Sequence, residues 1–148
     1  MKKAFVALLL LLPAAVGCGP NATTPTDEQA LTKEPKSLPE VLSRLKPMIA
    51  EINVAISTGN PTACDEELHD AMFLANRIPR FVDESPDGKA DDAVESSIRQ
   101  DAERLFQLLM TAHNAAHGGE FTVDDEVVTE QELAEEILAT YQRLESSG

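Results

Sequence analysis

From residue 37 to the C-terminal end, apolar residues recur along the chain at steps of three and four. This spacing is typical of amphipathic helices, which bury one face and expose the other. Turn-forming residues divide the pattern into four stretches, at about residues 37–58, 61–78, 89–117 and 129–148. Four such helices with short connections predict an all-α domain over residues 37–148, folded as an antiparallel four-helix bundle.

Two of the predicted helices begin with the residues of a capping box. Ser37 is followed three residues later by Glu40, and Thr129 by Glu132. In this motif the two side chains bond each other's backbone N–H groups and so fix the start of a helix. The first stretch also contains Pro47, which lacks an N–H and is therefore expected to kink or split its helix.

The N-terminal segment has a different pattern. Lys2 and Lys3 precede an uncharged, leucine-rich run over residues 4–12. A helix that spans a bilayer needs ~20 apolar residues, so this run is too short to cross one. It has the length of the apolar region of a signal peptide.

Ala15, Val16 and Gly17 follow this run and precede Cys18. Together, the basic start, the apolar run and the cysteine resemble the signal of bacterial lipoproteins. The resemblance covers about the first 19 residues. The resemblance implies that residues 1–17 are removed and that Cys18 becomes the lipidated first residue. In that family an aspartate after the cysteine often signals retention in the inner membrane. Gly19 in that place implies the outer membrane, with the domain facing the periplasm.

Residues 18–36 are rich in proline, threonine and other polar residues and hold few large apolar ones. This composition predicts a flexible tether between the lipidated cysteine and the helical domain. No later stretch is long and apolar enough to span a bilayer. The chain is therefore expected to attach to the membrane through its lipid and not through a transmembrane segment.

The chain has two cysteines, Cys18 and Cys64. A lipidated Cys18 leaves Cys64 without an intramolecular partner, and the place of Cys64 on the apolar side of its stretch predicts a buried thiol. The alternative is an ordinary secretory signal that leaves Cys18 unmodified. An oxidising compartment would then allow a disulfide between the two cysteines.

Acidic residues dominate the charge of the chain. The formal net charge is −14, and removal of Lys2 and Lys3 with the signal would take it to −16. Binding of nucleic acid or of an anionic membrane surface needs clustered basic residues, so neither is predicted. Solvated helix faces are the simpler explanation of this charge, and the alternative is that it attracts a basic protein partner or a cation.

His113 and His117 are the strongest candidates for a binding site. They lie four residues apart and so share one side of the third predicted helix, with Met110 one turn earlier. Such a pair can chelate zinc, copper or nickel. A hairpin of the third and fourth helices would bring Glu132 and Glu136 towards it. The alternative is that these histidines interact only with the dipole of their own helix, by ~0.3–1 kcal/mol each when charged.

The third histidine, His69, is expected to lie apart from this pair. A hairpin of the second and third stretches about residue 85 would place His69 level with residue 101. At 1.5 Å per residue, that position is roughly 18 Å from His113. His69 is therefore predicted to be a surface residue outside any shared site.

Enzymatic activity is not predicted. The segment from His113 to His117 has the histidine spacing of the HExxH zinc proteases, but Asn114 replaces the glutamate that acts as general base. Nucleophile elbows, glycine-rich phosphate loops and the C-x-x-C-H haem attachment motif are absent. The sequence predicts a non-enzymatic interaction or structural module without a cofactor. The alternative is a bundle that binds a divalent transition metal or haem through His113 and His117.

The lipid on Cys18 can be tested by intact-mass analysis of protein purified from the membrane fraction. We expect the mass of the mature chain plus acyl groups. Each buried methylene of these groups contributes ~0.8 kcal/mol to membrane attachment, so the lipidated protein should be recovered with the membrane. Cys18→Ser should move the protein to the soluble fraction, whereas Cys64→Ser should leave it on the membrane. A mature mass without acyl groups would exclude the anchor.

Overall fold

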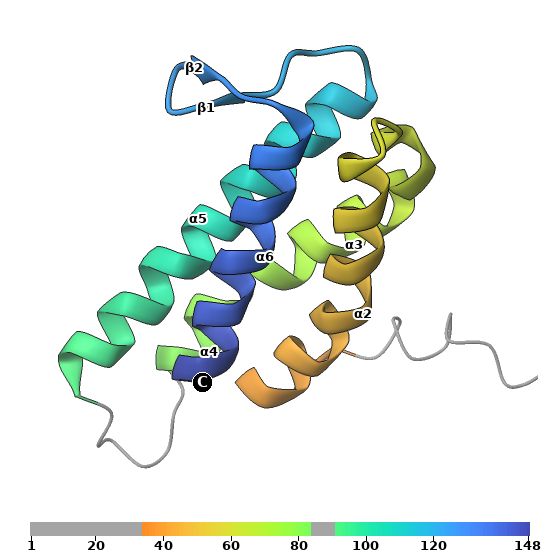
Figure 1. Cartoon of the computed structure of the whole chain (residues 1–148). Coiled ribbons are helices and arrows are strands. Elements are labelled where there is room, and N and C mark those ends of the chain that lie inside the picture. Colours follow the sequence, from red (N-terminus) through yellow and green to blue (C-terminus); the bar gives the residue numbers. More distant parts are fainter. Residues whose placement is uncertain (1–33, 84–90) are drawn as a thin grey trace, which may run out of the picture. The chain divides into compact units, whose positions relative to one another are not determined.

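The computed structural model describes residues 34–83 and 91–148 (Figure 1). The predicted signal, Cys18 and most of the predicted tether lie outside the described residues. The described part belongs to a single unit from Glu34 to Gly148. It is mostly helical, which confirms the prediction of an all-α domain.

The elements follow the four predicted stretches, and a short helix that was not predicted lies between the second and third. In chain order they are helix α2 (Leu38–Ser57), the 3-10 turn η1 (Pro61–Cys64), helices α3 (Asp65–Ala75), α4 (Ile78–Asp83) and α5 (Asp92–Ala116), strands β1 (Thr122–Val123) and β2 (Glu126–Val127), and helix α6 (Glu130–Ser147). None of the helices in the described ranges combines the length and apolarity needed to cross a membrane.

The predicted apolar stripes meet in one core. Helix α6 packs against both α2 and α5, and α3 packs against α2 and α5. The largest side chains with almost no exposure to water come from these four helices and α4, and they include Leu45, Ile49, Ile52, Ile56, Leu68, Ile78, Leu105, Leu108, Leu109, Leu133, Ile137 and Leu144. Each fully buried side chain of this kind contributes about 1.5–3 kcal/mol, and this burial holds the helices together.

Two polar side chains tie α6 to α2 across this core. The Tyr141 hydroxyl donates a hydrogen bond to the Leu42 carbonyl over 3.0 Å, and the Asn53 amide donates one to the Ala134 carbonyl over 2.7 Å. Burial, together with the charge of Glu145, raises the pKa of Tyr141 to about 12. The phenol therefore keeps its proton and remains a donor at neutral pH.

The capping box at Thr129 is complete. The Thr129 hydroxyl accepts a hydrogen bond from the Glu132 N–H over 3.2 Å, and the Glu132 carboxylate accepts one from the Thr129 N–H over 2.8 Å. The bond from the Thr129 N–H to the Glu132 carboxylate lowers the pKa of Glu132 most, and a bond from the Thr129 hydroxyl to the same carboxylate over 2.9 Å lowers it further. Because the pKa is lower in the folded state, this stabilisation is present above the ordinary carboxylate range and is lost as the pH falls through the folded value.

The capping box predicted at Ser37 forms only in part. The Ser37 hydroxyl accepts from the Glu40 N–H over 3.4 Å. The Glu40 carboxylate instead accepts from the Lys36 N–H over 2.9 Å and pairs with Arg44. The helix still begins at the predicted place, because one of its free N–H groups is satisfied by the serine.

Helix α2 continues through Pro47 and is not split there. A proline in a helix leaves the carbonyl four residues earlier without its partner, which here is the carbonyl of Ser43. Ser43 and Pro47 both face solvent, so water can satisfy that carbonyl. Leu45 and Ile49 on the opposite side are buried and hold the helix on both sides of the proline.

The second predicted helix ends close to the predicted position, and a short helix that was not predicted follows it. Helix α3 ends at Ala75, a turn at Asn76 and Arg77 follows, and α4 begins at Ile78. Pro79 lies in the first turn of α4, where its missing N–H costs no helical hydrogen bond. The chain therefore begins a new helix, α4, at Ile78. Helix α3 ends before it and does not reach the segment that leads to α5.

The predicted loop between the last two helices contains a two-stranded antiparallel ribbon, in which Thr122 pairs with Val127 and Val123 with Glu126. Asp124 and Asp125 form its turn with positive φ angles of 52° and 67°. Two-residue hairpin turns of this kind need positive φ at both positions, and aspartate tolerates it better than most residues.

Candidate metal centre

Helices α3 and α5 each carry two potential metal ligands four residues apart. Asp65 and His69 lie in the first part of α3, and His113 and His117 lie at the C-terminal end of α5. Residues at this spacing share one side of a helix. Because α3 packs against α5, each helix can turn its pair towards the other.

Contacts between the two helices fix how the pairs meet. The Thr62 hydroxyl in η1 donates to the Ala116 carbonyl over 3.2 Å. One turn further, Asp65 lies beside His117, and the next pair is His69 and His113. From Asp65 to His69 the residue numbers rise along α3 while those of the facing residues fall from His117 to His113, so the two ligand pairs face each other.

The first three ligands converge on one point. Oδ1 of Asp65 lies 3.2 Å from Nε2 of His117 and 3.7 Å from Nε2 of His113. One ligand atom from each of the three residues lies within 4.8 Å of the others. The rings of His113 and His117 are close, with centroids 4.7 Å apart and planes at 66°. This is a compact cluster of one carboxylate and two imidazoles.

Oδ1 of Asp65 is buried and has no hydrogen-bond partner among the described residues, although the side chain as a whole is 38% exposed. A buried polar atom without a partner costs about 1–3 kcal/mol, and more when it is charged. The Nε2 atoms of His117 and His113 lie 3.2 and 3.7 Å from this oxygen, close enough to form ion pairs with it when these histidines are protonated. A cation held between the carboxylate and the imidazoles would satisfy all three groups.

His69 lies against His113, and the predicted separation of roughly 18 Å is therefore wrong. The Nε2 atoms of the two rings are 2.6 Å apart, and the ring centroids 4.5 Å. The prediction assumed one straight hairpin about residue 85, whereas α3 ends at Ala75 and the chain turns before α4. The expectation of surface exposure is confirmed, since His69 is exposed.

The other predicted ligands have different surroundings. Met110 is 42% exposed on α5. The Glu136 carboxylate accepts a hydrogen bond from Nε of Arg104 over 2.9 Å, and Glu132 caps its own helix through Thr129. The structure thus gives both glutamates partners outside the cluster of Asp65, His113 and His117.

Sequence reasoning overlooked Asp65 as a candidate ligand. Its signal was present in the spacing: Asp65 and His69 repeat the four-residue interval of His113 and His117. Two such intervals on helices that pack together are a stronger indication of a metal site than either alone. The two intervals indicate a metal site only when the two helices are known to be neighbours, and the sequence alone does not show this.

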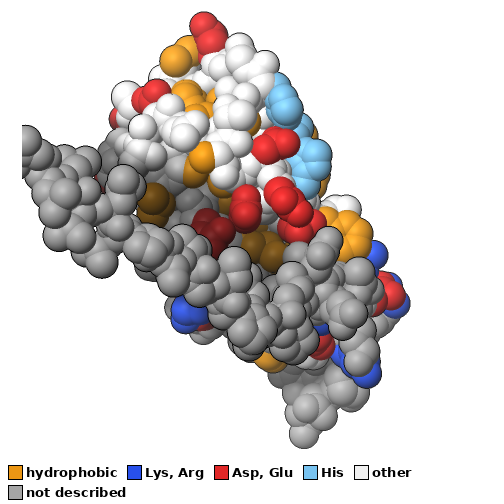
Figure 2. Space-filling model, turned by 90° about the vertical axis from the view of Figure 1, so that its right-hand side faces the viewer, with side chains coloured by type: hydrophobic (Ala, Val, Ile, Leu, Met, Phe, Trp, Pro, Cys, Tyr) orange, Lys and Arg blue, Asp and Glu red, His pale blue; other side chains and the backbone are white. Residues whose placement is uncertain are grey.

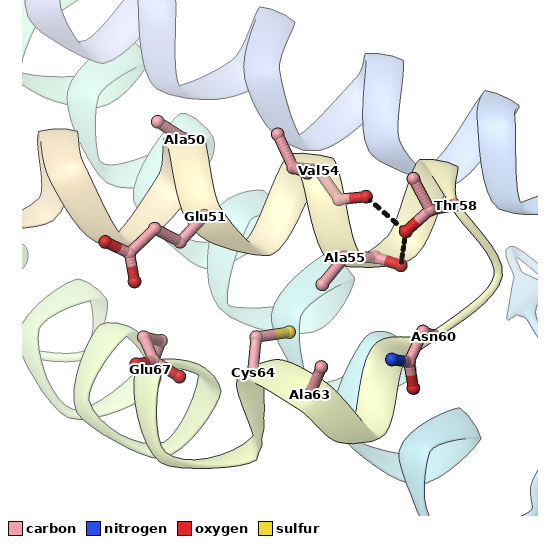
Figure 3. A pocket seen from close by; sticks show the side chains of 9 residues that line it. All are labelled: Ala50, Glu51, Val54, Ala55, Thr58, Asn60, Ala63, Cys64 and Glu67. Carbon is pink, nitrogen blue, oxygen red and sulfur yellow. Dashed lines mark hydrogen bonds between the residues drawn. The ribbon is translucent and has the colours of Figure 1, made fainter. Parts of the chain in front are cut away.

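A groove of about 500 Å³ lies between α2 and the η1–α3 segment (Figure 3). Its lining includes small side chains such as Ala50, Ala55 and Ala63, and the sulfur of Cys64 points from η1 towards α2. Cys64 is only 2% exposed, which confirms the predicted burial. Desolvation, with the nearby charge of Glu67, raises the pKa of this thiol to about 11. The thiol is therefore protonated at neutral pH and is no nucleophile.

Alkylation of Cys64 tests this environment in a Cys18→Ser variant, which leaves a single cysteine. A rise of the thiol pKa from 9.0 to about 11 lowers the thiolate fraction about a hundredfold at pH 7.5. Iodoacetamide labelling followed by mass spectrometry should therefore be at least that much slower in the native protein than in urea. Equal rates in the two states would contradict the burial of Cys64.

Comparisons with protein-family models, with curated proteins and with solved structures found no match. Function must therefore be inferred from the residues of this chain, and the cluster of Asp65, His113 and His117 is the part of the described structure that offers the most specific chemistry.

Proposed function

We propose that the domain binds a divalent first-row transition-metal ion through Asp65, His113 and His117. The observation that carries this proposal is the buried Oδ1 of Asp65, which has two imidazole nitrogens beside it and no hydrogen-bond partner among the described residues. Donors that share a tetrahedral ion at about 2.0–2.1 Å lie about 3.3 Å from one another. The observed separations of 3.2 and 3.7 Å fall on either side of that value.

The types of donor favour particular ions. Imidazole suits zinc, copper, nickel and iron, whereas calcium and magnesium take oxygen ligands. Nε2 of both His113 and His117 faces the Asp65 carboxylate. This arrangement supports a small ion held between the helices more than it supports haem, the other ligand considered for these histidines.

The site is open to arriving ions. Side-chain exposure is 59% at His117 and 23% at His113, and Figure 2 shows histidines at the molecular surface beside carboxylates. The net charge of −14 raises the local concentration of cations around the chain. Metal can therefore enter without a large rearrangement of the core.

The proposed setting for this site is an exported, lipid-anchored protein without catalytic activity. In this setting Cys18 carries the lipid at the outer membrane, and residues 18–36 tether the domain in the periplasm. We also propose that α2, α3 with α4, α5 and α6 form the antiparallel four-helix bundle expected from the sequence. The contacts of α3 and α6 with both α2 and α5 support this arrangement.

Isothermal titration of metal-stripped protein with Zn²⁺ tests the proposed site. The wild type should bind one ion, and Asp65→Asn, His113→Ala and His117→Ala should each weaken binding at least about tenfold, or ~1.4 kcal/mol, because each removes a ligand. Glu66→Gln is the matched control: it removes a neighbouring charge in the same turn of α3 and should leave affinity within about twofold. Absence of Zn²⁺ binding by the folded wild type, or equal affinity in Asp65→Asn, would refute the proposal.

A second candidate function is the docking of a basic partner protein on the groove between α2 and η1. Val54 at this groove is 62% exposed. The lining residues Glu51 and Glu67 form no ion pair or hydrogen bond with another described residue. An apolar surface flanked by unpaired carboxylates suits a partner that offers an apolar side chain next to a lysine or arginine.

Cross-linking in cells followed by mass spectrometry tests this interaction. A partner bound through the groove should be captured by the wild type and lost in Val54→Asp, because a charge would enter the apolar contact. Val127→Asp is the control, since Val127 is 73% exposed and lies on β2 rather than at the groove. Equal capture by all three proteins would exclude the groove as the docking surface.

A further inference from the structure

We infer that His69 is a fourth ligand of this ion, so that metal binding closes a tetrahedral site and joins α3 to α5. This inference rests on the proposed function and deepens it. Its basis is the contact between His69 and His113, whose Nε2 atoms face each other at 2.6 Å. His113 in turn faces Asp65, so the four donors form a continuous chain: His69, His113, Asp65 and His117.

The distances along this chain are close to those between ligands of one ion. The three successive separations are 2.6, 3.7 and 3.2 Å. Donors around a tetrahedral zinc ion lie about 3.3 Å apart. His69 lies outside the group of Asp65, His113 and His117, whose ligand atoms all lie within 4.8 Å of one another. As a fourth ligand it must move its Nε2 less than about 1 Å away from that of His113 and also turn towards Asp65 and His117.

The contact between the two histidines is short for a hydrogen bond between two nitrogen atoms. A distance of 2.6 Å is shorter than the normal range of about 2.7–3.2 Å for a hydrogen bond from a nitrogen donor. Two neutral rings facing each other through Nε2 can share at most one proton, and two protonated rings would repel. Two neutral rings can form one N–H···N hydrogen bond here, whereas a metal ion would accept the lone pairs of both nitrogens.

His69 is free to make this adjustment. Its side chain is exposed, whereas its neighbour Leu68 is fully buried and fixes the backbone of α3 against the core. The His69 ring can therefore turn towards the ion while the helix stays in place. The same argument predicts that replacing His69 will not unfold the domain, because its side chain contributes little to the core.

Four protein ligands leave no open position for water or substrate. A closed site with three imidazoles and one carboxylate favours Zn²⁺ and other ions that accept tetrahedral coordination. Zinc sites that perform catalysis keep one position open. A fourth protein ligand therefore makes this a site that holds the ion and stabilises the contact between α3 and α5, since ion binding to the folded state alone adds to stability.

Titration of the metal-stripped full chain with Co²⁺ tests the role of His69, because four-coordinate Co²⁺ absorbs visible light much more strongly than six-coordinate Co²⁺. The wild type should give the intense spectrum. His69→Ala should give a weak one and bind at least about tenfold less tightly. Asp70→Asn, next to His69 on α3, is the control and should behave as the wild type. Circular dichroism should show that all variants are folded.

The outcomes separate this inference from the proposed function. An intense spectrum that is lost in His69→Ala supports a fourth ligand. Equal affinity and equal spectra for the wild type and His69→Ala would overturn the role of His69 and leave the site of Asp65, His113 and His117 intact. If the folded wild type binds neither Co²⁺ nor Zn²⁺, the proposed function itself is refuted, and the inference about His69 falls with it.

Discussion

Helix α3 lies against α5 through small apolar side chains that are shielded from water. Ala71 and Ala75 of α3 and Ala112 of α5 are almost completely buried. Side chains of this size let two helices approach closely, and the bulkier leucines beside them fix the register. That register brings Asp65 to His117 and His69 to His113. A shift of one residue along α3 would rotate its ligands by about 100° away from α5, so the geometry of the site depends on this packing.

The apolar period was enough to predict the helices, because the stripes it marks are the faces that the core buries. Local signals were equally informative where they act within one turn, as at the Thr129 capping box. It was harder to predict which residues of two neighbouring helices lie side by side, because this depends on where each helix ends and where the chain turns. The prediction centred the hairpin of α3 and α5 at residue 85, whereas the contacts of Asp65 with His117 and of His69 with His113 centre it at residue 91, and this error separated His69 from His113 in the prediction. Asp65 was overlooked for the same reason, since its spacing from His69 has meaning only beside α5.

Electrostatics link the site to the rest of the chain. Asp65 begins α3 together with Glu66 and Glu67, and His113 and His117 end α5. The partial negative charge at the C-terminal end of a helix favours a nearby cation, and the acidic first turn of α3 offsets the partial positive charge of its N-terminal end. The proposed ion would therefore lie where the C-terminal end of α5 and the three carboxylates of α3 create a favourable potential. The strong negative charge of the whole chain acts in the same direction.

The central claim is that one ion lies between α3 and α5. Anomalous diffraction from a crystal of the protein grown with Zn²⁺, measured at the zinc absorption edge, tests it most directly. We predict one strong peak about 2.0–2.2 Å from Oδ1 of Asp65 and from Nε2 of His113 and His117, with His69 as the fourth neighbour. A fully occupied peak elsewhere on the protein, with these side chains unbound, would contradict the claim.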